Sequence, residues 1–593
     1  MTVNNTDSGP DWVTNLWGGF LEDAVDIGTI HGTRDLVDYF PVFLDLKQLL
    51  TVLPATTTGV KYKLKHETGA LNVVFTNLTR ATAFDYQRTP LTTGFGGTEL
   101  HGALNKAPGD ATKWHLTAAG LELPVEYLSL IQNNDGGVIL IDGRSATDKP
   151  LVLAVEKDGA TIAEIKLELR ISPVEQMFRH VNLTGVTTQY NGAAITPSLS
   201  APASRTGDPG VPWPDSLTNG KYFVFVHGYN VDAEKARGWQ TEVFKRLHVL
   251  GSKARFVGVT WHGATGKDYH KAVFHAFQTG NVLSSYLSFT NGADVTVAAH
   301  SLGNMVVSQA IQDGGFAPSR YFMINAAVPI EAYELSSIDA AQRLDMTEDD
   351  WKSRDTRFFA ANWNLLFAST PADYRNELTW RERFLSVRRD FECHNFYSPG
   401  EDVVADMPGV DSASVAAAIW NDGSDFVRGR GAWKMQELVK GVNWTTSPAA
   451  AFMERGQGGW DADLAYLLTP DAQITNEQLK TRPYFDEFLE ADLIDADTTR
   501  ASAKAGEAKV QYDLLARGLP ALSYAVAAHQ LGSIPSAQNF NMETYGRVSS
   551  RWPTEGHSGT TAQGHWLHSD FRNVALLYVY PMYEAMIAKG SLK

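Results

Sequence analysis

The stretch Asp294–Gln309, D-V-T-V-A-A-H-S-L-G-N-M-V-V-S-Q, decides how the rest of the chain is interpreted. Its first part, Asp294–Ala299, is short, apolar and rich in β-branched residues, which is typical of a buried parallel strand. After a turn over Ala299–Gly303, apolar residues recur at helical spacing until Gly314 and Gly315. We therefore predict a buried strand, a tight turn and a helix.

The turn has the pattern small-x-Ser-x-small, with Ala299, Ser301 and Gly303 at the defining positions and His300 between them. This is the nucleophile-elbow pattern, in which the backbones before and after the serine nearly touch and a larger side chain would clash. It exposes the serine over the carboxyl edge of a sheet, at a helix N-terminus that favours a developing negative charge. Because so short a pattern is common by chance, the interpretation depends on the motifs around it.

Length and charge limit the possible classes of protein. The chain has 593 residues, too many for one core, so two or three domains are expected. A net charge of −16 argues against a nucleic-acid partner and against binding to an anionic membrane. The sequence holds no H-E-x-x-H, paired C-x-x-C, phosphate-loop or calcium-loop motif, so neither a metal nor a cofactor is predicted.

Targeting signals are scarce. The one cysteine, Cys393, allows no internal disulfide, although many exported bacterial enzymes also lack disulfides. The first residues lack the basic start and apolar run of a signal peptide, and the apolar stretch 574–587 is too short and interrupted to span a bilayer. We predict a soluble protein without a membrane span; the compartment and the oligomeric state stay open.

The first third of the chain has a different pattern of predicted secondary structure. Residues 1–50 are interpreted as a helical segment, and residues 51–194 as an antiparallel β-sandwich domain with several short strands. Its clearest hairpin joins 151–156 to 161–171 through Asp158-Gly159, a strong turn signal. This domain either binds a polymer or carbohydrate or supports the next domain. A linker rich in Pro, Gly and Ser follows at 195–220.

Residues 221–593 alternate between strand and helix patterns, which predicts a mostly parallel sheet of the α/β class. Such sheets bind ligands at the carboxyl ends of their strands. The first buried strand ends in His227-Gly228-Tyr229-Asn230, a turn that can aim a backbone N–H at a carbonyl oxygen. The Leu302 N–H would be the second donor of an oxyanion hole.

An acid and a base follow in the chain order Ser, acid, His, which is the order expected after a nucleophile elbow. Glu401 and Asp402 come after a predicted strand and turn; since adjacent side chains on an extended segment point apart, one of them should reach the base. Asp is the commoner choice, while the following Val-Val fits Glu401, so we favour Asp402 and keep both. His568, in a loop before the last helix, is the predicted base, with His565 and His557 as alternatives.

The motifs V-F-V-H-G-Y-N-V and A-H-S-L-G-N resemble the α/β-hydrolase superfamily, in particular bacterial serine esterases and lipases. The resemblance spans about residues 221–593; it departs from the common pattern in Ala299, where Gly is usual, and in its long insertions. It implies Ser301 as nucleophile, Tyr229 and Leu302 as oxyanion donors, Glu401 or Asp402 as acid and His568 as base. Insertions at about 326–388 and 405–560 would form a helical cap.

The leading expectation is a serine hydrolase that cleaves a small-molecule or polymeric carboxylic ester through an acyl-enzyme. A thioesterase, amidase or acyltransferase could use the same three residues. A chain that keeps the hydrolase fold without activity and serves as a binding protein is the alternative from another class. The sequence does not define the ester or its acyl length.

Overall fold

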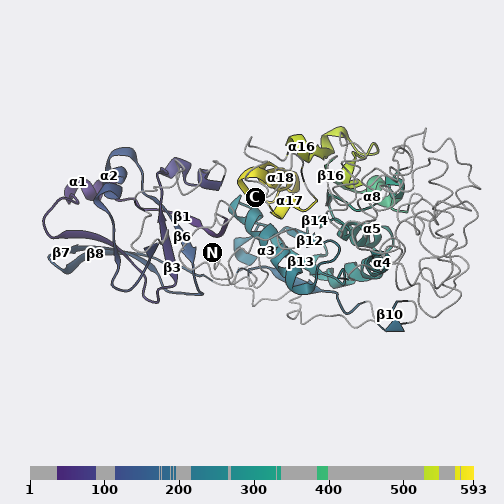
Figure 1. Cartoon of the computed structure of the whole chain (residues 1–593), viewed down its shortest axis with the longest axis horizontal. Helices are drawn as coiled ribbons and strands as arrows, with labels where there is room; N and C mark the ends of the chain where they lie inside the picture. Colours follow the sequence, from purple (N-terminus) through teal and green to yellow (C-terminus); the bar gives the residue numbers. More distant parts are fainter. Residues whose placement is uncertain are drawn as a thin grey trace, which may run out of the picture.

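The computed structural model describes residues 37–87, 104, 114–171, 174, 177–186, 189–190, 193–194, 215–264, 269–328, 330–334, 383–398, 526–545, 566, 568–573 and 576–593. Figure 1 shows the chain with its elements labelled. Of the helices in these ranges, none combines the length and the apolar character needed to cross a membrane.

A seven-stranded sheet organises the larger part of the described chain. Its order is β17-β16-β15-β14-β12-β13-β9, and every neighbouring pair is parallel. The strands are β9 (Arg179–Asn182), β12 (Tyr222–Val226), β13 (Arg255–Thr260), β14 (Val295–His300), β15 (Arg320–Ile324), β16 (Glu392–Tyr397) and β17 (Asn539–Asn541). The predicted parallel sheet is confirmed, and β14, buried along its whole length, lies at its centre.

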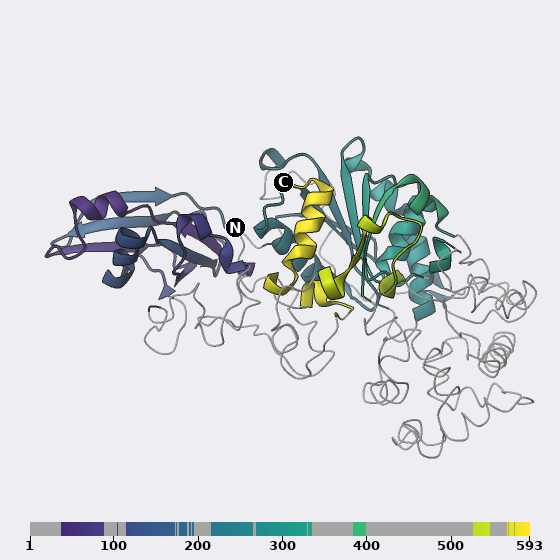
Figure 2. The ribbon, with the colours of Figure 1, turned by 90° about the horizontal axis from the view of Figure 1, so that it is seen from above.

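Helices cover both faces of this sheet, as Figures 1 and 2 show. On one face Phe223, Phe225 and Ala298 pack in a cluster with α3 (Ala233–Val249), α17 (Asp570–Asn573) and α18 (Leu576–Gly590). The alternate residues, such as Val224 and Val297, pack on the other face with α4 (Tyr269–Tyr286) and α5 (Gly303–Gln312). A short helix, α8 (Leu385–Asp390), precedes β16. The strands read as continuous apolar runs because both of their faces are buried.

Two four-stranded antiparallel sheets form the N-terminal part. One has the order β1-β6-β3-β4 and the other β5-β2-β7-β8. Their strands are β1 (Phe40–Phe43), β2 (Val60–Lys65), β3 (Leu71–Phe75), β4 (Trp114–His115), β5 (Leu121–Glu122), β6 (Val138–Gly143), β7 (Leu151–Lys157) and β8 (Ala160–Leu167). Both sheets contribute to one hydrophobic cluster together with α1 (Lys47–Val52) and α2 (Val125–Asn134). The two antiparallel sheets agree with the predicted β-rich domain, whereas their stacking as a sandwich stays a prediction.

The hairpin predicted at Asp158-Gly159 is confirmed. β7 and β8 pair antiparallel around this turn, and both turn residues have positive φ, 49° and 83°. Two left-handed residues in succession give the local twist that a two-residue hairpin loop requires, and Gly supplies one of them without steric cost.

Three boundaries differ from the sequence interpretation. Residues 40–43 form an edge strand rather than the end of a helix, and Pro41 is tolerated there because an edge strand has one unpaired side. Residues 179–182, assigned to the β-sandwich domain, are instead the edge strand β9 of the parallel sheet. Residues 539–541, inside the second predicted cap, extend the same sheet as β17. Most of both cap ranges and residues 195–214 of the linker lie outside the described residues.

Candidate active site

Ser301 occupies the turn between β14 and α5 with a left-handed backbone. Its φ is 54°, an uncommon value for a residue with a side chain, and only 6% of its surface is exposed. Such conformations cost about 1–3 kcal/mol and persist only where neighbouring contacts impose them. Here the Ser301 N–H donates to the Ile324 carbonyl at 3.0 Å, and the Asn304 side chain donates to the Ala299 and Ser301 carbonyls at 3.0 and 2.9 Å.

Two glycines allow the backbone to close around this turn. A Cβ built on Gly303 would lie 2.4 Å from the carbonyl oxygen of His227 and 2.7 Å from that of Val226. A Cβ on Gly228 would lie 2.7 Å from the Cβ of Ser301. The end of β12 and its turn therefore lie directly against the turn that contains Ser301. A small residue is required at Gly303, as predicted, but the obstacle is the backbone at the end of β12 rather than the backbone before the serine.

The turn after β12 is fixed by a neutral histidine. His227 is fully buried, and burial lowers its pKa to about 4. Its Nε2 accepts from the Trp261 N–H at 3.1 Å, so the proton resides on Nδ1, which donates to the Gly228 carbonyl at 2.9 Å. The Trp261 indole donates to the His227 carbonyl at 2.8 Å. His227 thus holds the turn rather than facing the site, and Trp261 is a support that the sequence analysis missed.

The proposed donors Tyr229 and Leu302 come from the two turns that meet at Ser301. Tyr229 follows Gly228 in the fixed turn and packs against the hydrophobic cluster under α4 and α5. Asn230, the next residue, has φ 55° and donates its N–H to the Gly263 carbonyl at 2.8 Å. Leu302 directly follows Ser301 as the N-cap residue of α5, where the first helical N–H groups lack intrahelical partners.

His568 lies at the end of the same sheet. It is buried, and its carbonyl oxygen accepts from His300 Nε2 at 2.8 Å and from Asn325 Nδ2 at 2.9 Å. The imidazole rings of His300 and His568 have their centroids 4.8 Å apart. Burial and the neighbouring His568 hold the pKa of His300 well below its usual value, so His300 is neutral near pH 7. The residue before Ser301 therefore anchors the segment that carries His568.

Asn325 is a second anchor that the sequence analysis missed. It directly follows β15, has φ 40°, and donates its N–H to the Phe396 carbonyl at 2.9 Å. A polar residue at the carboxyl end of a buried strand was the signal that could have identified it.

The predicted acid follows β16 in the sequence. Ser398, the last described residue after β16, donates its hydroxyl to Glu543 Oε1 at 2.8 Å and to the Trp566 carbonyl at 3.1 Å. Trp566 donates its N–H to the same Glu543 oxygen at 2.5 Å. Ser398 and Trp566 therefore lie next to each other, joined through Glu543. Glu401, Asp402, His557 and His565 lie outside the described residues.

In this described portion of the chain, His, Cys, Asp and Glu side chains do not gather in groups of three or more that could hold a metal ion.

Comparisons with known proteins bear on the α/β part of the chain. None of the curated proteins matches the sequence at a significant level. The crystal structure of Aspergillus fumigatus lipase B is similar at 13% identity, over 59% of this chain and 77% of that chain. Its TM-score of 0.18 is too low to carry an argument about fold or function. Residues 216–336, which hold β12, β14, Ser301 and α5, match the model of a family described as "Alpha/beta hydrolase of unknown function (DUF900)". This match confirms the resemblance to the α/β-hydrolase superfamily over that region.

Proposed function

We propose that the chain is a serine hydrolase that cleaves carboxylic esters, with Ser301 as nucleophile and His568 as general base. The observation that carries this proposal is the left-handed Ser301 in a strand-to-helix turn, adjacent to the residue that anchors the His568 segment. Strained non-glycine residues of this kind cluster at active sites, because structure elsewhere must hold them in place. Glu401 or Asp402 is proposed to orient the imidazole.

The proposed reaction has two steps. The Ser301 hydroxyl attacks the ester carbonyl carbon while His568 accepts its proton, and the alcohol leaves with a proton returned by His568. Water then attacks the acyl-enzyme, again with His568 as base, and releases the acid. The N–H groups of Tyr229 and Leu302 would stabilise the oxyanion of each tetrahedral intermediate. Loss of one such donor typically raises the barrier by about 3–4 kcal/mol.

The test is hydrolysis of p-nitrophenyl esters and covalent labelling by a fluorophosphonate. Ser301→Ala should abolish labelling and lower kcat by about 10³-fold or more, with unchanged folding. Ser285→Ala is the control: Ser285 is exposed on α4 and its hydroxyl donates to the Val282 carbonyl of its own helix. Wild-type rates in the Ser301→Ala protein would rule out the proposed nucleophile.

A further inference from the structure

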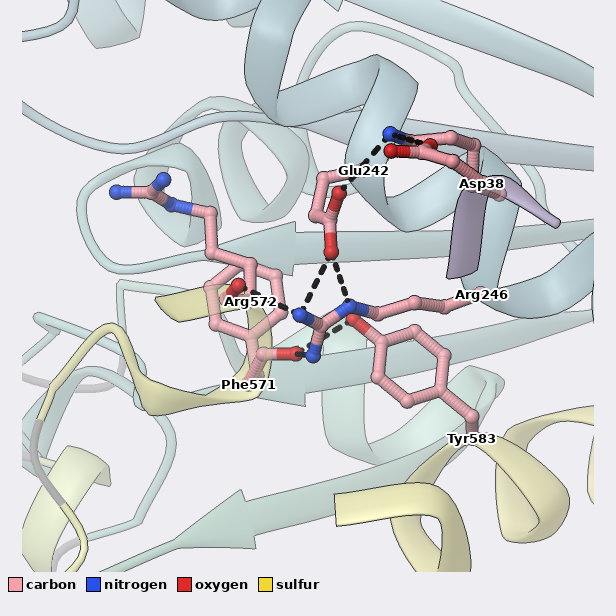
Figure 3. A network of polar contacts seen from close by, with 7 residues as sticks. Asp38, Glu242, Arg246, Phe571, Arg572 and Tyr583 are labelled. Carbon is pink, nitrogen blue, oxygen red and sulfur yellow. Dashed lines mark hydrogen bonds and ion pairs between the residues drawn. The ribbon is translucent and has the colours of Figure 1, made fainter. Parts of the chain in front are cut away.

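A line of buried charges runs along α3 on the face opposite α4 and α5. Lys245 Nζ pairs with Asp38 Oδ1 at 2.5 Å and with Glu242 Oε2 at 3.6 Å. The other oxygen of Glu242 accepts from Arg246, 2.7 Å from Nε and 2.6 Å from Nη2. All four side chains are buried. Figure 3 labels Asp38, Glu242 and Arg246 and draws their contacts as dashed lines. Charges alternate along the line, so each one is compensated by a neighbour in a medium of low dielectric.

The far end of this line holds the segment that follows His568. Arg246 donates from Nη1 to the Phe571 carbonyl at 2.9 Å and from Nη2 to the Arg572 carbonyl at 2.7 Å. The Tyr583 hydroxyl, from α18, donates to the same Phe571 carbonyl at 2.7 Å. Both carbonyls belong to α17, a helix of four residues that begins at Asp570. So short a helix leaves its carbonyls without intrahelical donors, and the guanidinium group of Arg246 donates hydrogen bonds to two of them.

The near end of the line lies in the N-terminal part. Asp38 is two residues before β1, the edge strand of an antiparallel sheet, and Val37 belongs to the same hydrophobic cluster as α3 and α18. The contact joins residues 207 positions apart in sequence. The carboxylate of Asp38 therefore belongs to one part of the chain and the ammonium group that it compensates belongs to the other.

From this geometry we infer that Arg246 is a positioning residue for His568, and that Asp38 couples the N-terminal part to the same segment. Arg246 holds two carbonyls within four residues of His568, on one side, while His300 and Asn325 hold the His568 carbonyl on the other. Without the carboxylate of Asp38, Lys245 competes with Arg246 for Glu242. The hydrogen bonds from Arg246 to the carbonyls of α17 are then weakened. The expected effect on kcat rests on the proposed function of His568 as the base. The expected effect on the stability of the segment around His568 does not.

The experiment compares Arg246→Lys and Asp38→Asn in the full chain. Lysine keeps the charge but cannot donate to both carbonyls and to Glu242 in one plane. Arg179→Lys is the matched control, because Arg179 is also buried and pairs through Nη2 with both oxygens of Asp215, at the start of β9 rather than at the carboxyl edge. The readouts are hydrogen exchange of peptides covering residues 568–573 and the kinetics of p-nitrophenyl ester hydrolysis.

In Arg246→Lys we expect exchange in these peptides to speed up by about 10-fold, as local opening becomes easier. We expect kcat to fall about 10- to 100-fold with little change in KM, because a displaced base disturbs the transition state rather than binding. Asp38→Asn should change both readouts in the same direction by less, and Arg179→Lys should change neither.

The outcomes separate the two proposals. If Ser301→Ala abolishes hydrolysis but Arg246→Lys and Asp38→Asn leave exchange and kcat at wild-type values, the positioning inference is wrong and the hydrolase proposal stands. If the wild-type protein hydrolyses no ester while exchange still rises in Arg246→Lys, the coupling stands and the proposed function fails. Should Arg246→Lys not fold, Asp38→Asn decides, because it keeps the size of the side chain and removes only its charge.

Discussion

His300 Nε2 donates a hydrogen bond to the carbonyl oxygen of His568 at 2.8 Å, although 268 positions separate the two residues. One ring thus connects the turn that contains Ser301 with the segment before the last helix. The ring also packs against Trp239 and Phe571, with centroid distances of 5.1 and 4.7 Å. A neutral His300 contributes a donor and an aromatic surface to the site, and these two contributions can be separated by mutation.

His300→Phe keeps the aromatic surface and removes the donor. Because Asn325 still donates to the His568 carbonyl, we expect an intact fold and a fall in kcat of about 10-fold from a less firmly held imidazole. The free energy of unfolding should change by about 1 kcal/mol or less, the usual net worth of one hydrogen bond. Urea unfolding and ester hydrolysis measure the two quantities.

His300→Gln is the companion variant, since its amide restores an N–H donor without the ring. Its kcat should lie above that of His300→Phe. If the phenylalanine variant is the more active of the two, ring packing rather than the hydrogen bond controls the His568 segment.

Gly303→Ala tests the close approach at the turn. The new methyl group would lie 2.4 Å from the His227 carbonyl oxygen, and the obstacle is backbone that cannot rotate away. We expect a loss of about 1–3 kcal/mol in the free energy of unfolding, as in other overpacked sites, together with loss of esterase activity. Gly185→Ala is the control, because a Cβ there meets nothing within 4 Å. Equal stability of the two alanine variants in urea would contradict the steric account.

Much of the α/β part could be predicted from sequence because its signals are local. The strands at 222–226 and 295–300 are continuous apolar runs, and the turn at Ser301 has a pattern with a steric cause. β9 has the sequence R-H-V-N and β17 only three residues, so neither shows a periodicity; each becomes a strand by pairing with a distant partner. Contacts such as Asp38 with Lys245 likewise depend on the folded chain and leave no trace in spacing.

The residues of the candidate site likewise fall into those that the sequence predicts and those that it does not. Positions of Ser301, Gly303 and the turn at Gly228 follow from short motifs, whereas the anchors Asn325 and Trp261 are single residues without a motif. The order of the motifs in the chain predicts His568 as the base, and its ring lies beside that of His300, although its role as a base stays a prediction. The acid lies outside the described residues, so Asp402 and Glu401 both stay predictions.

Stability should fall as the pH is lowered, because His227 is buried in its neutral form. Its pKa is lowered by burial from 6.5 to about 4, so between these values the unfolded chain binds a proton that the folded chain does not. Folding stability from this group is therefore complete above pH 6.5 and is lost as the pH falls toward 4. From pH 6.5 to pH 5 the loss is about 2 kcal/mol, at about 1.4 kcal/mol per unit.

His227→Gln removes this titration while an amide can still accept from the Trp261 N–H and donate to the Gly228 carbonyl. The variant should be less stable than wild type at pH 7.5, since the amide fits the two partners less well than the ring. Its decline between pH 6.5 and pH 5, measured by urea unfolding at each pH, should nevertheless be smaller by about 2 kcal/mol. Other buried histidines, such as His300, titrate in both proteins, so the difference between the two curves isolates His227. Parallel curves would mean that the imidazole of His227 becomes protonated in the folded protein as readily as in water, and that its hydrogen bonds to the turn beside Ser301 are not those of a neutral ring.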